Sequence, residues 1–71
     1  MKFSPILLAL AWVLGSWKGY LALFDPGAEE PRQIWPVLVE ALPEADRLAL
    51  EEGITIRGKR RLDAMLEDYL S

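Results

Sequence analysis

The chain has 71 residues, of which 52% are hydrophobic, and a chain of this length forms one small domain with no room for a second core. It contains neither cysteine nor histidine, which excludes disulfides, thiolate metal sites and the most common general base. The net charge of −3 is mild and does not indicate a nucleic-acid partner.

An uncharged apolar segment begins at Phe3, directly after a lysine, and runs to Leu14. A positive charge followed by an apolar stretch is typical of an export signal or a membrane anchor. No clear cleavage site follows, so an uncleaved anchor fits as well as a processed signal. The alternatives are a hydrophobic helix packed on the domain and a misassigned start of the chain. Because a strand pattern begins at Trp12, we assign residues 1–11 to the signal-like or anchor-like segment.

The next stretch predicts a β-hairpin, because aromatic and β-branched residues occur there at strand spacing. Lys18-Gly19 suits a two-residue turn, in which glycine supplies a positive φ. This turn pairs Trp17 with Tyr20. The same register places four further residues on the face that carries these two side chains: Val13, Gly15, Ala22 and Phe24. The opposite face then carries Trp12, Leu14, Ser16, Leu21, Leu23 and Asp25. We therefore expect strands over residues 12–17 and 20–25.

A polar loop rich in turn-forming residues, from Asp25 to Pro31, separates this hairpin from a third predicted strand. In residues 33–39, one face of that strand carries the apolar side chains Trp35, Val37 and Val39. Pro36 has no N–H to donate to a neighbouring strand. The third strand is therefore expected at an edge of the sheet, with the proline nitrogen facing outward.

A first helix is predicted to start at Pro43, whose fixed φ suits the first helical position. Glu44 and Asp46 then lie at the positive end of the helix dipole. Gly53 is expected to end this helix, because glycine takes a positive φ without penalty. The apolar stripe of the helix is expected to consist of Leu42, Ala45, Leu48 and Ala49.

A second helix is predicted after Gly58, because apolar residues recur at the spacing i, i+3, i+4 and i+7 at Leu62, Met65, Leu66 and Tyr69. Its charges oppose the helix dipole, and each mismatch costs about 0.3–1 kcal/mol. Burial of each large apolar side chain contributes roughly 1.5–3 kcal/mol, so the helix is expected to form in spite of its charges. Between the two helices, Ile54-Thr55-Ile56 predicts a short extended segment.

These elements predict an α+β fold, with a small three-stranded antiparallel meander followed by two helices and preceded by the apolar N-terminal segment. The domain is expected to cover residues 12–71. No residue pattern indicates a catalytic, cofactor or metal site, so we expect no enzyme. Asp63 and Glu67 stand at i and i+4 on a predicted helix, but exposed acidic residues at this spacing are usually a solvated face.

Four of the eight basic residues lie within five positions, and we call them the basic cluster: Arg57, Lys59, Arg60 and Arg61. The simplest interpretation is a solvated turn. The functional interpretation is a contact with anionic lipid head groups or with an acidic partner protein, because cations near a membrane gain electrostatic attraction. Nucleic acid is disfavoured, since no exposed aromatic residues for base stacking are indicated. Trp12, Trp17 and Tyr20 are expected in the core, with an aromatic belt at a membrane interface as the alternative.

Two longer patterns carry a family resemblance. The first is Leu42-Pro43-Glu44-x-Asp46-Arg47-x-x-Leu50-Glu51-x-Gly53-Ile54, followed by Leu62-x-x-x-Leu66-Glu67-Asp68-Tyr69-x-Ser71. The second is the hairpin Trp17-Lys18-Gly19-Tyr20-Leu21-Ala22-Leu23-Phe24. With these residues, the chain resembles the C-terminal domain of the bypass-of-forespore protein C family of spore-forming bacteria, over roughly residues 12–71. No motif in the match is catalytic.

The resemblance implies an exported or membrane-associated sporulation protein without enzymatic activity, located in the forespore intermembrane space. The best-known family member resembles a checkpoint regulator that restrains a signalling serine protease between forespore and mother cell. A regulatory or scaffold module with such a partner is therefore implied. The chain departs from the family at Lys59-Arg60-Arg61, where the family usually runs acidic. The alternative function is a general small membrane-associated protein that binds anionic lipid or a membrane complex.

Overall fold

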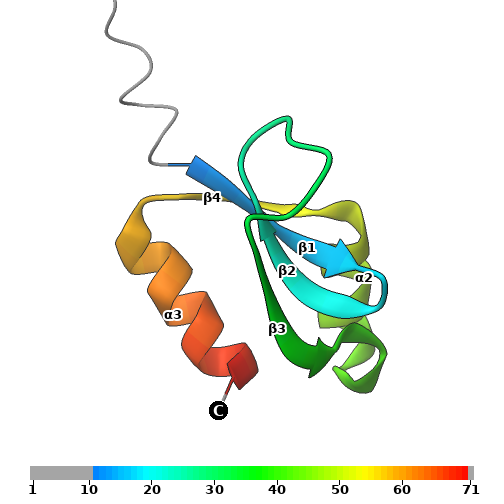
Figure 1. Cartoon of the computed structure of the whole chain (residues 1–71). Helices are drawn as coiled ribbons and strands as arrows, with labels where there is room; N and C mark the ends of the chain where they lie inside the picture. Colours follow the sequence, from blue (N-terminus) through cyan, green and yellow to red (C-terminus); the bar gives the residue numbers. More distant parts are fainter. Residues whose placement is uncertain (1–10, 71) are drawn as a thin grey trace, which may run out of the picture.

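The computed structural model describes residues 11–70 and has an α+β architecture, which confirms the predicted fold class. One four-stranded antiparallel sheet has the strand order β3-β2-β1-β4, and two α-helices complete the domain (Figure 1). The strands are β1 (Ala11–Trp17), β2 (Tyr20–Phe24), β3 (Gln33–Leu38) and β4 (Ile54–Arg57). The helices are the 3₁₀ helix η1 (Val39–Ala41) and the α-helices α2 (Glu44–Glu52) and α3 (Lys59–Leu70).

The predicted hairpin is confirmed in its register. Trp17 pairs with Tyr20, and the pairing continues to Val13 opposite Phe24. Lys18 and Gly19 both have a positive φ, of 52° and 90°, which is the turn geometry that matches the twist of the two strands. Of the two faces, the one that carries Leu14, Leu21 and Leu23 is the inner face of the sheet, because these three side chains are buried.

The predicted number of three strands is wrong, because the link between the helices joins the sheet as a fourth strand. β4 pairs antiparallel with the first half of β1, with Ala11 opposite Arg57 and Leu14 opposite Ile54. The added strand makes the first half of β1 central in the sheet, with β4 on one side and β2 on the other. Ala11, which we had assigned to the N-terminal segment, is the first residue of β1; the rest of that segment lies outside the described residues.

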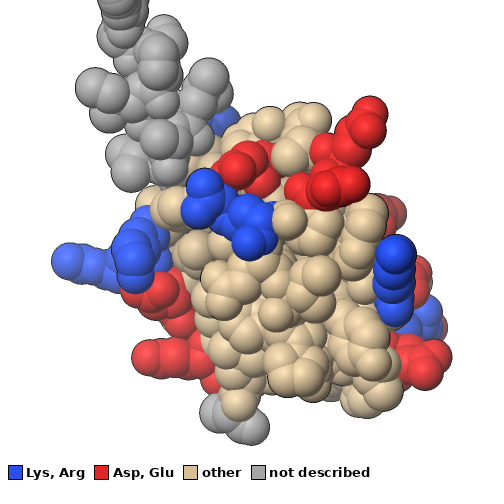
Figure 2. Space-filling model, viewed as in Figure 1, with Lys and Arg blue, Asp and Glu red and all other residues tan. Residues whose placement is uncertain are grey.

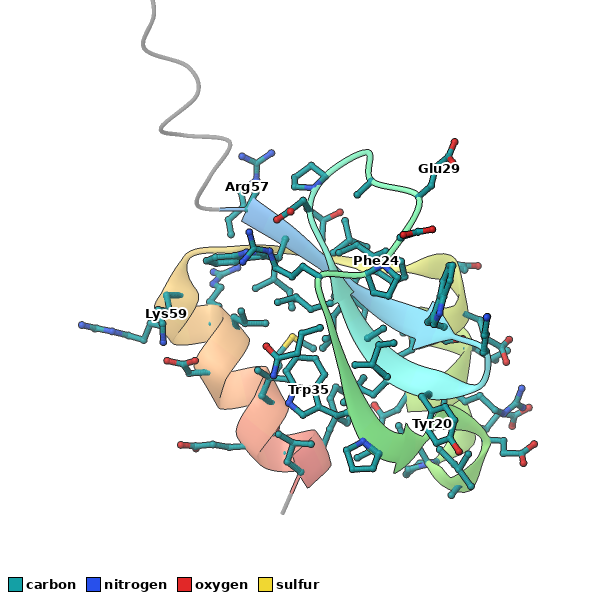
Figure 3. All side chains as sticks on the ribbon, viewed as in Figure 1. Tyr20, Phe24, Glu29, Trp35, Arg57 and Lys59 are labelled. Carbon is teal, nitrogen blue, oxygen red and sulfur yellow. The ribbon has the colours of Figure 1, made fainter. Side chains whose placement is uncertain are left out.

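β3 is an edge strand, as Pro36 had predicted. Its register against β2 shifts between the pairs Tyr20–Leu38 and Ala22–Ile34, and Pro36 lies within this irregular part. Such bulges are common at sheet edges. Trp35 points from β3 towards α3 (Figure 3), and with Val37 it packs against the core. The strand ends one residue earlier than predicted, because Val39 begins η1.

The core lies between the inner face of the sheet and the helices, and it consists of Leu14, Leu21, Leu23, Val39, Leu50, Ile56 and Leu62. The stripe predicted for α3 is confirmed, since Leu62 is buried and the three later members pack against the core.

The stripe predicted for α2 is wrong. Leu48 is 49% exposed, whereas Leu50, two residues later, is 1% exposed and belongs to the core; of the four predicted residues, Leu42 alone packs there. The reason is the way in which this nine-residue helix meets the sheet. A Cβ atom on Gly15 would lie 3.3 Å from the Leu50 carbonyl oxygen, so the C-terminal end of α2 sits directly beside β1.

The boundaries of α2 agree with the sequence to within one residue. The helix begins at Glu44, with Pro43 as its N-cap instead of its first helical residue. Gly53 caps the other end with a φ of 93°, which confirms the predicted positive φ. Its N–H group donates to the carbonyl oxygens of Ala49 and Leu50, at 2.9 and 3.2 Å. The ψ of 127° lies outside the left-handed helical region, so the conformation is one that glycine alone adopts readily.

Candidate functional site

The basic cluster lies where β4 ends and α3 begins. Arg57 is the last residue of β4 and Lys59 is the first residue of α3, and Gly58 turns the chain between them with a φ of 92°. All four side chains of the cluster are exposed. Figure 3 shows Arg57 and Lys59 pointing outward at the same end of the domain. The four predicted residues thus lie in one short stretch of chain, at the junction of β4 and α3.

The pairing of β1 with β4 adds a neighbour that the sequence did not predict. Ala11 stands directly opposite Arg57 in the sheet, and opposite residues in an antiparallel pair have Cα atoms about 4.5–5.5 Å apart. Residues 1–10 are joined to the domain at Ala11. The apolar N-terminal segment and the basic cluster are therefore attached to the same end of the domain.

The cluster is only partly neutralised within the domain. Lys59 Nζ lies 2.9 Å from Asp63 Oδ2, and both side chains are more than half exposed, so this pair contributes about 0.2–1 kcal/mol. Arg57, Arg60 and Arg61 form no ion pair with another residue in the range 11–70. Three guanidinium groups are thus exposed without an acidic partner among the described residues.

Asp63 and Glu67, the acidic pair at i and i+4, both lie exposed on α3. Asp63 pairs with Lys59 across one helical turn, which supports the interpretation of Asp63 and Glu67 as a solvated face. Among residues 11–70, no group of three potential metal-ligating side chains comes together.

Among residues 11–70, Tyr69 is the one side chain whose pKa departs clearly from its ordinary value. Burial raises the pKa of its phenol, and the negative charges of Asp46 and Asp68 raise it further. The phenol lines a small hollow between the start of α2 and the end of α3, together with Leu42 and Met65. The ring of Tyr69 also packs against the core.

The aromatic residues divide between the two faces of the sheet. Trp12 packs against the core, as expected. Trp17 lies on the outer face, where its ring meets Phe24 edge-to-face at 6.2 Å and Lys18 Nζ lies 5.6 Å from its centroid. The core assignment is wrong for Tyr20, which is 42% exposed. In Figure 2, charged side chains surround the viewed side of the domain and leave its centre uncharged.

A groove between β4 and α3 is a feature that the sequence did not predict. It has a volume of about 310 Å³, and its lining is mainly apolar, formed by Ile54, Thr55, Ile56, Arg61, Ala64 and Met65. The groove requires β4 at the edge of the sheet with α3 packed beside it. The signal in the sequence was the β-branched run before Arg57, which we had read as a link between helices.

Comparisons with protein-family models, with curated proteins and with solved structures found no match. The resemblance over residues 12–71 therefore stays a prediction that rests on the quoted patterns. Within residues 11–70, neither α-helix is long and apolar enough to cross a membrane.

Proposed function

We propose that this chain is a non-enzymatic regulatory or scaffold module that works at a membrane surface and contacts anionic lipid head groups through the basic cluster. The observation that carries the proposal is the pairing of Ala11 with Arg57. It attaches the signal-like or anchor-like segment and the cluster to the same end of the domain. An apolar segment combined with a basic patch is a common way to hold a protein at a membrane.

The strength of this contact follows from the number of cations. Each Lys or Arg near an anionic membrane contributes about 1 kcal/mol of attraction, so the four residues of the cluster contribute roughly 4 kcal/mol. The net charge of −3 opposes this attraction. Because electrostatic interactions decay over about 8 Å at physiological salt, however, the residues nearest the membrane dominate.

Charge reversal of Lys59, Arg60 and Arg61 to Glu is expected to weaken binding to anionic vesicles at least ten-fold, because three attractive charges become repulsive. The free energy of unfolding should change by less than about 1 kcal/mol, since the loss of the Lys59–Asp63 pair is offset by a better match to the helix dipole. The measurement is vesicle co-sedimentation of residues 11–71 at low and high salt. The truncation stops before Ala11, because Ala11 is part of β1.

The matched control reverses three cations outside the cluster, Lys18, Arg32 and Arg47, and so carries the same net charge. This control should keep most of the vesicle binding, and added salt should abolish the difference between the two variants. If the cluster variant and the control bind anionic vesicles equally well, the basic cluster is only a solvated turn.

A second candidate function is the sporulation-associated regulation of a signalling serine protease between forespore and mother cell. What supports it is the resemblance, whose more specific part is the pattern from Leu42 to Ser71. It predicts transcription only during sporulation, whereas a general membrane-associated protein is also transcribed in growing cells. A time course of transcript levels through growth and sporulation separates the two. Transcript in growing cells at the level found in sporulating cells would contradict the sporulation role.

A further inference from the structure

We infer that the open edge of β4 and its groove against α3 bind an extended peptide segment of a partner protein, which adds to the sheet as a fifth strand and carries carboxylates. The inference rests on the proposed role as a regulatory or scaffold module, because such a module needs a protein partner. It assigns that partner a binding mode and a chemistry.

The hairpin register determines which backbone groups of β1 face β4. Trp17 and Tyr20 flank a two-residue turn, so they exchange backbone hydrogen bonds, and every second pair along the hairpin does the same. The backbone groups of Trp12 and Leu14 therefore point away from β2 and towards β4. Their partners there are Ile56 and Ile54.

It follows that the N–H and C=O groups of Thr55 and Arg57 point to the outer edge of β4. The same alternation can be checked on the β3 side of β2. There Leu23 accepts a bond from the N–H of Arg32 at 2.7 Å, and Gly19 accepts one from the N–H of Val39 at 2.9 Å. Both acceptors lie at the odd-numbered positions that the alternation requires.

The outer edge of β4 is open in the described chain. β4 is the last strand of the sheet order, and no strand among residues 11–70 lies beyond it. Unpaired backbone groups at a sheet edge are a template for another strand. With two outward-facing residues, β4 offers two N–H donors and two C=O acceptors to such a strand.

The surroundings of this edge indicate which peptide fits. Side chains of an added strand alternate between the two faces. On the α3 side they meet the groove, whose lining is apolar apart from Thr55 and Arg61. On the other side they lie next to Arg57, which pairs with Ala11 and extends to the same face of the sheet as that residue.

Arg57 and Arg61 form no ion pair with another of residues 11–70. A segment that alternates aliphatic and acidic residues therefore presents apolar side chains to the groove and carboxylates to Arg57, while its backbone pairs with the edge of β4. A lipid acyl chain and head group would satisfy the groove and the arginines, but they would leave the edge backbone groups without partners. Strand addition of this kind draws affinity from main-chain bonds and specificity from pockets for alternate side chains.

The experiment measures binding of a fluorescent octapeptide of alternating valine and glutamate to the full-length chain in an uncharged detergent, by fluorescence anisotropy. Thr55→Pro removes an outward N–H, and proline is tolerated where its nitrogen faces away from the sheet. We expect Thr55→Pro to bind at least ten-fold more weakly than the unaltered chain. Thr55→Val, which keeps the N–H group, should bind within two-fold of it, and a valine–lysine octapeptide should not bind.

A second measurement does not depend on a variant. Hydrogen exchange of the Thr55 and Arg57 amides should slow at least ten-fold when the peptide is added, whereas the already paired amides of Ile54 and Ile56 should change little. Unchanged exchange at Thr55 and Arg57, or equal peptide binding by Thr55→Pro and Thr55→Val, would overturn the inference. Competition by anionic vesicles without protection of these two amides would assign the groove to lipid and would overturn it as well.

The experiments can contradict the proposed lipid contact and the strand-addition inference independently of each other. Thr55→Pro alters no charge, so it should keep vesicle binding while it loses peptide binding. If the unaltered chain binds vesicles but does not bind the peptide, only the strand-addition inference is contradicted. If the unaltered chain binds the peptide and shows amide protection but does not bind vesicles, only the proposed lipid contact of the basic cluster is contradicted.

Discussion

Leu50→Ala is expected to lower the free energy of unfolding by about 2–5 kcal/mol, as large-to-small substitutions in cores do, whereas Leu48→Ala should lower it by less than about 1 kcal/mol. The two leucines lie two positions apart on α2, so the substitutions change helix propensity by the same amount. Their burial differs, with Leu50 1% exposed and Leu48 49% exposed. The difference between the two variants therefore measures burial alone.

The measurement is urea unfolding of the two variants and the unaltered domain, followed by circular dichroism. A domain of this size has a total stability of roughly 3–10 kcal/mol, so a loss of about 2–5 kcal/mol in Leu50→Ala is a large part of it. Equal losses for the two variants, or a larger loss for Leu48→Ala, would show that α2 buries the stripe that the sequence had predicted.

Gly53→Val is expected to destabilise the domain by about 2–6 kcal/mol for two separate reasons. The φ of 93° is strained for any residue with a side chain, which costs about 1–3 kcal/mol. In addition, a Cβ atom at this position would lie 3.2 Å from Val13 Cγ1 on β1, and crowding of this kind typically costs a further 1–3 kcal/mol or so. The two effects together should lower the melting temperature by more than about 5 °C.

Gly58→Val is the matched control, because Gly58 has nearly the same φ, 92°, but nothing lies within 4 Å of its Cβ position. Gly58→Val should show only the backbone strain, so its free energy of unfolding should fall by about 1–3 kcal/mol less than that of Gly53→Val. Thermal unfolding of the two variants provides the comparison. A melting temperature unchanged by Gly53→Val would mean that α2 does not end at this residue.

The parts of the fold that the sequence predicts well are those set by neighbouring residues. The hairpin follows from the Lys18-Gly19 turn and from a register that the turn itself fixes. The stripe of α3 follows from helical spacing over 12 residues. Both elements were predicted with their faces correct, because their local pattern and their tertiary contacts agree.

The parts that were missed depend on contacts between distant segments. β4 pairs with β1 across more than forty positions of the chain, and no local pattern specifies which strand a short β-branched run will join. On α2, spacing alone favoured Leu48, whereas the approach of the helix end to Gly15 selects Leu50. The tertiary contact decided the buried face of this short helix.

In the candidate site too, the sequence predicts what neighbouring residues determine and misses what contacts between distant segments determine. The basic cluster could be predicted because its four residues lie close together in the sequence. The position of the basic cluster opposite Ala11 could not be predicted, and neither could the groove between β4 and α3. Both depend on β4 being a strand of the sheet. A run of β-branched residues that ends in an arginine, placed between two helices, is the signal that would have indicated an edge strand.

The placement of the domain at the outer surface of a membrane is tested most directly by a reporter that is active only outside the cytoplasm, fused after Ser71. If the apolar segment is an export signal or an anchor, the positive-inside tendency keeps Lys2 in the cytoplasm and places the residues after Leu14 outside it. We expect reporter activity and recovery of the fusion with the membrane fraction or outside the cell. A control with Leu7→Arg and Leu8→Arg, which interrupts the apolar segment, should lose both. A silent reporter together with a soluble full-length protein would contradict this placement.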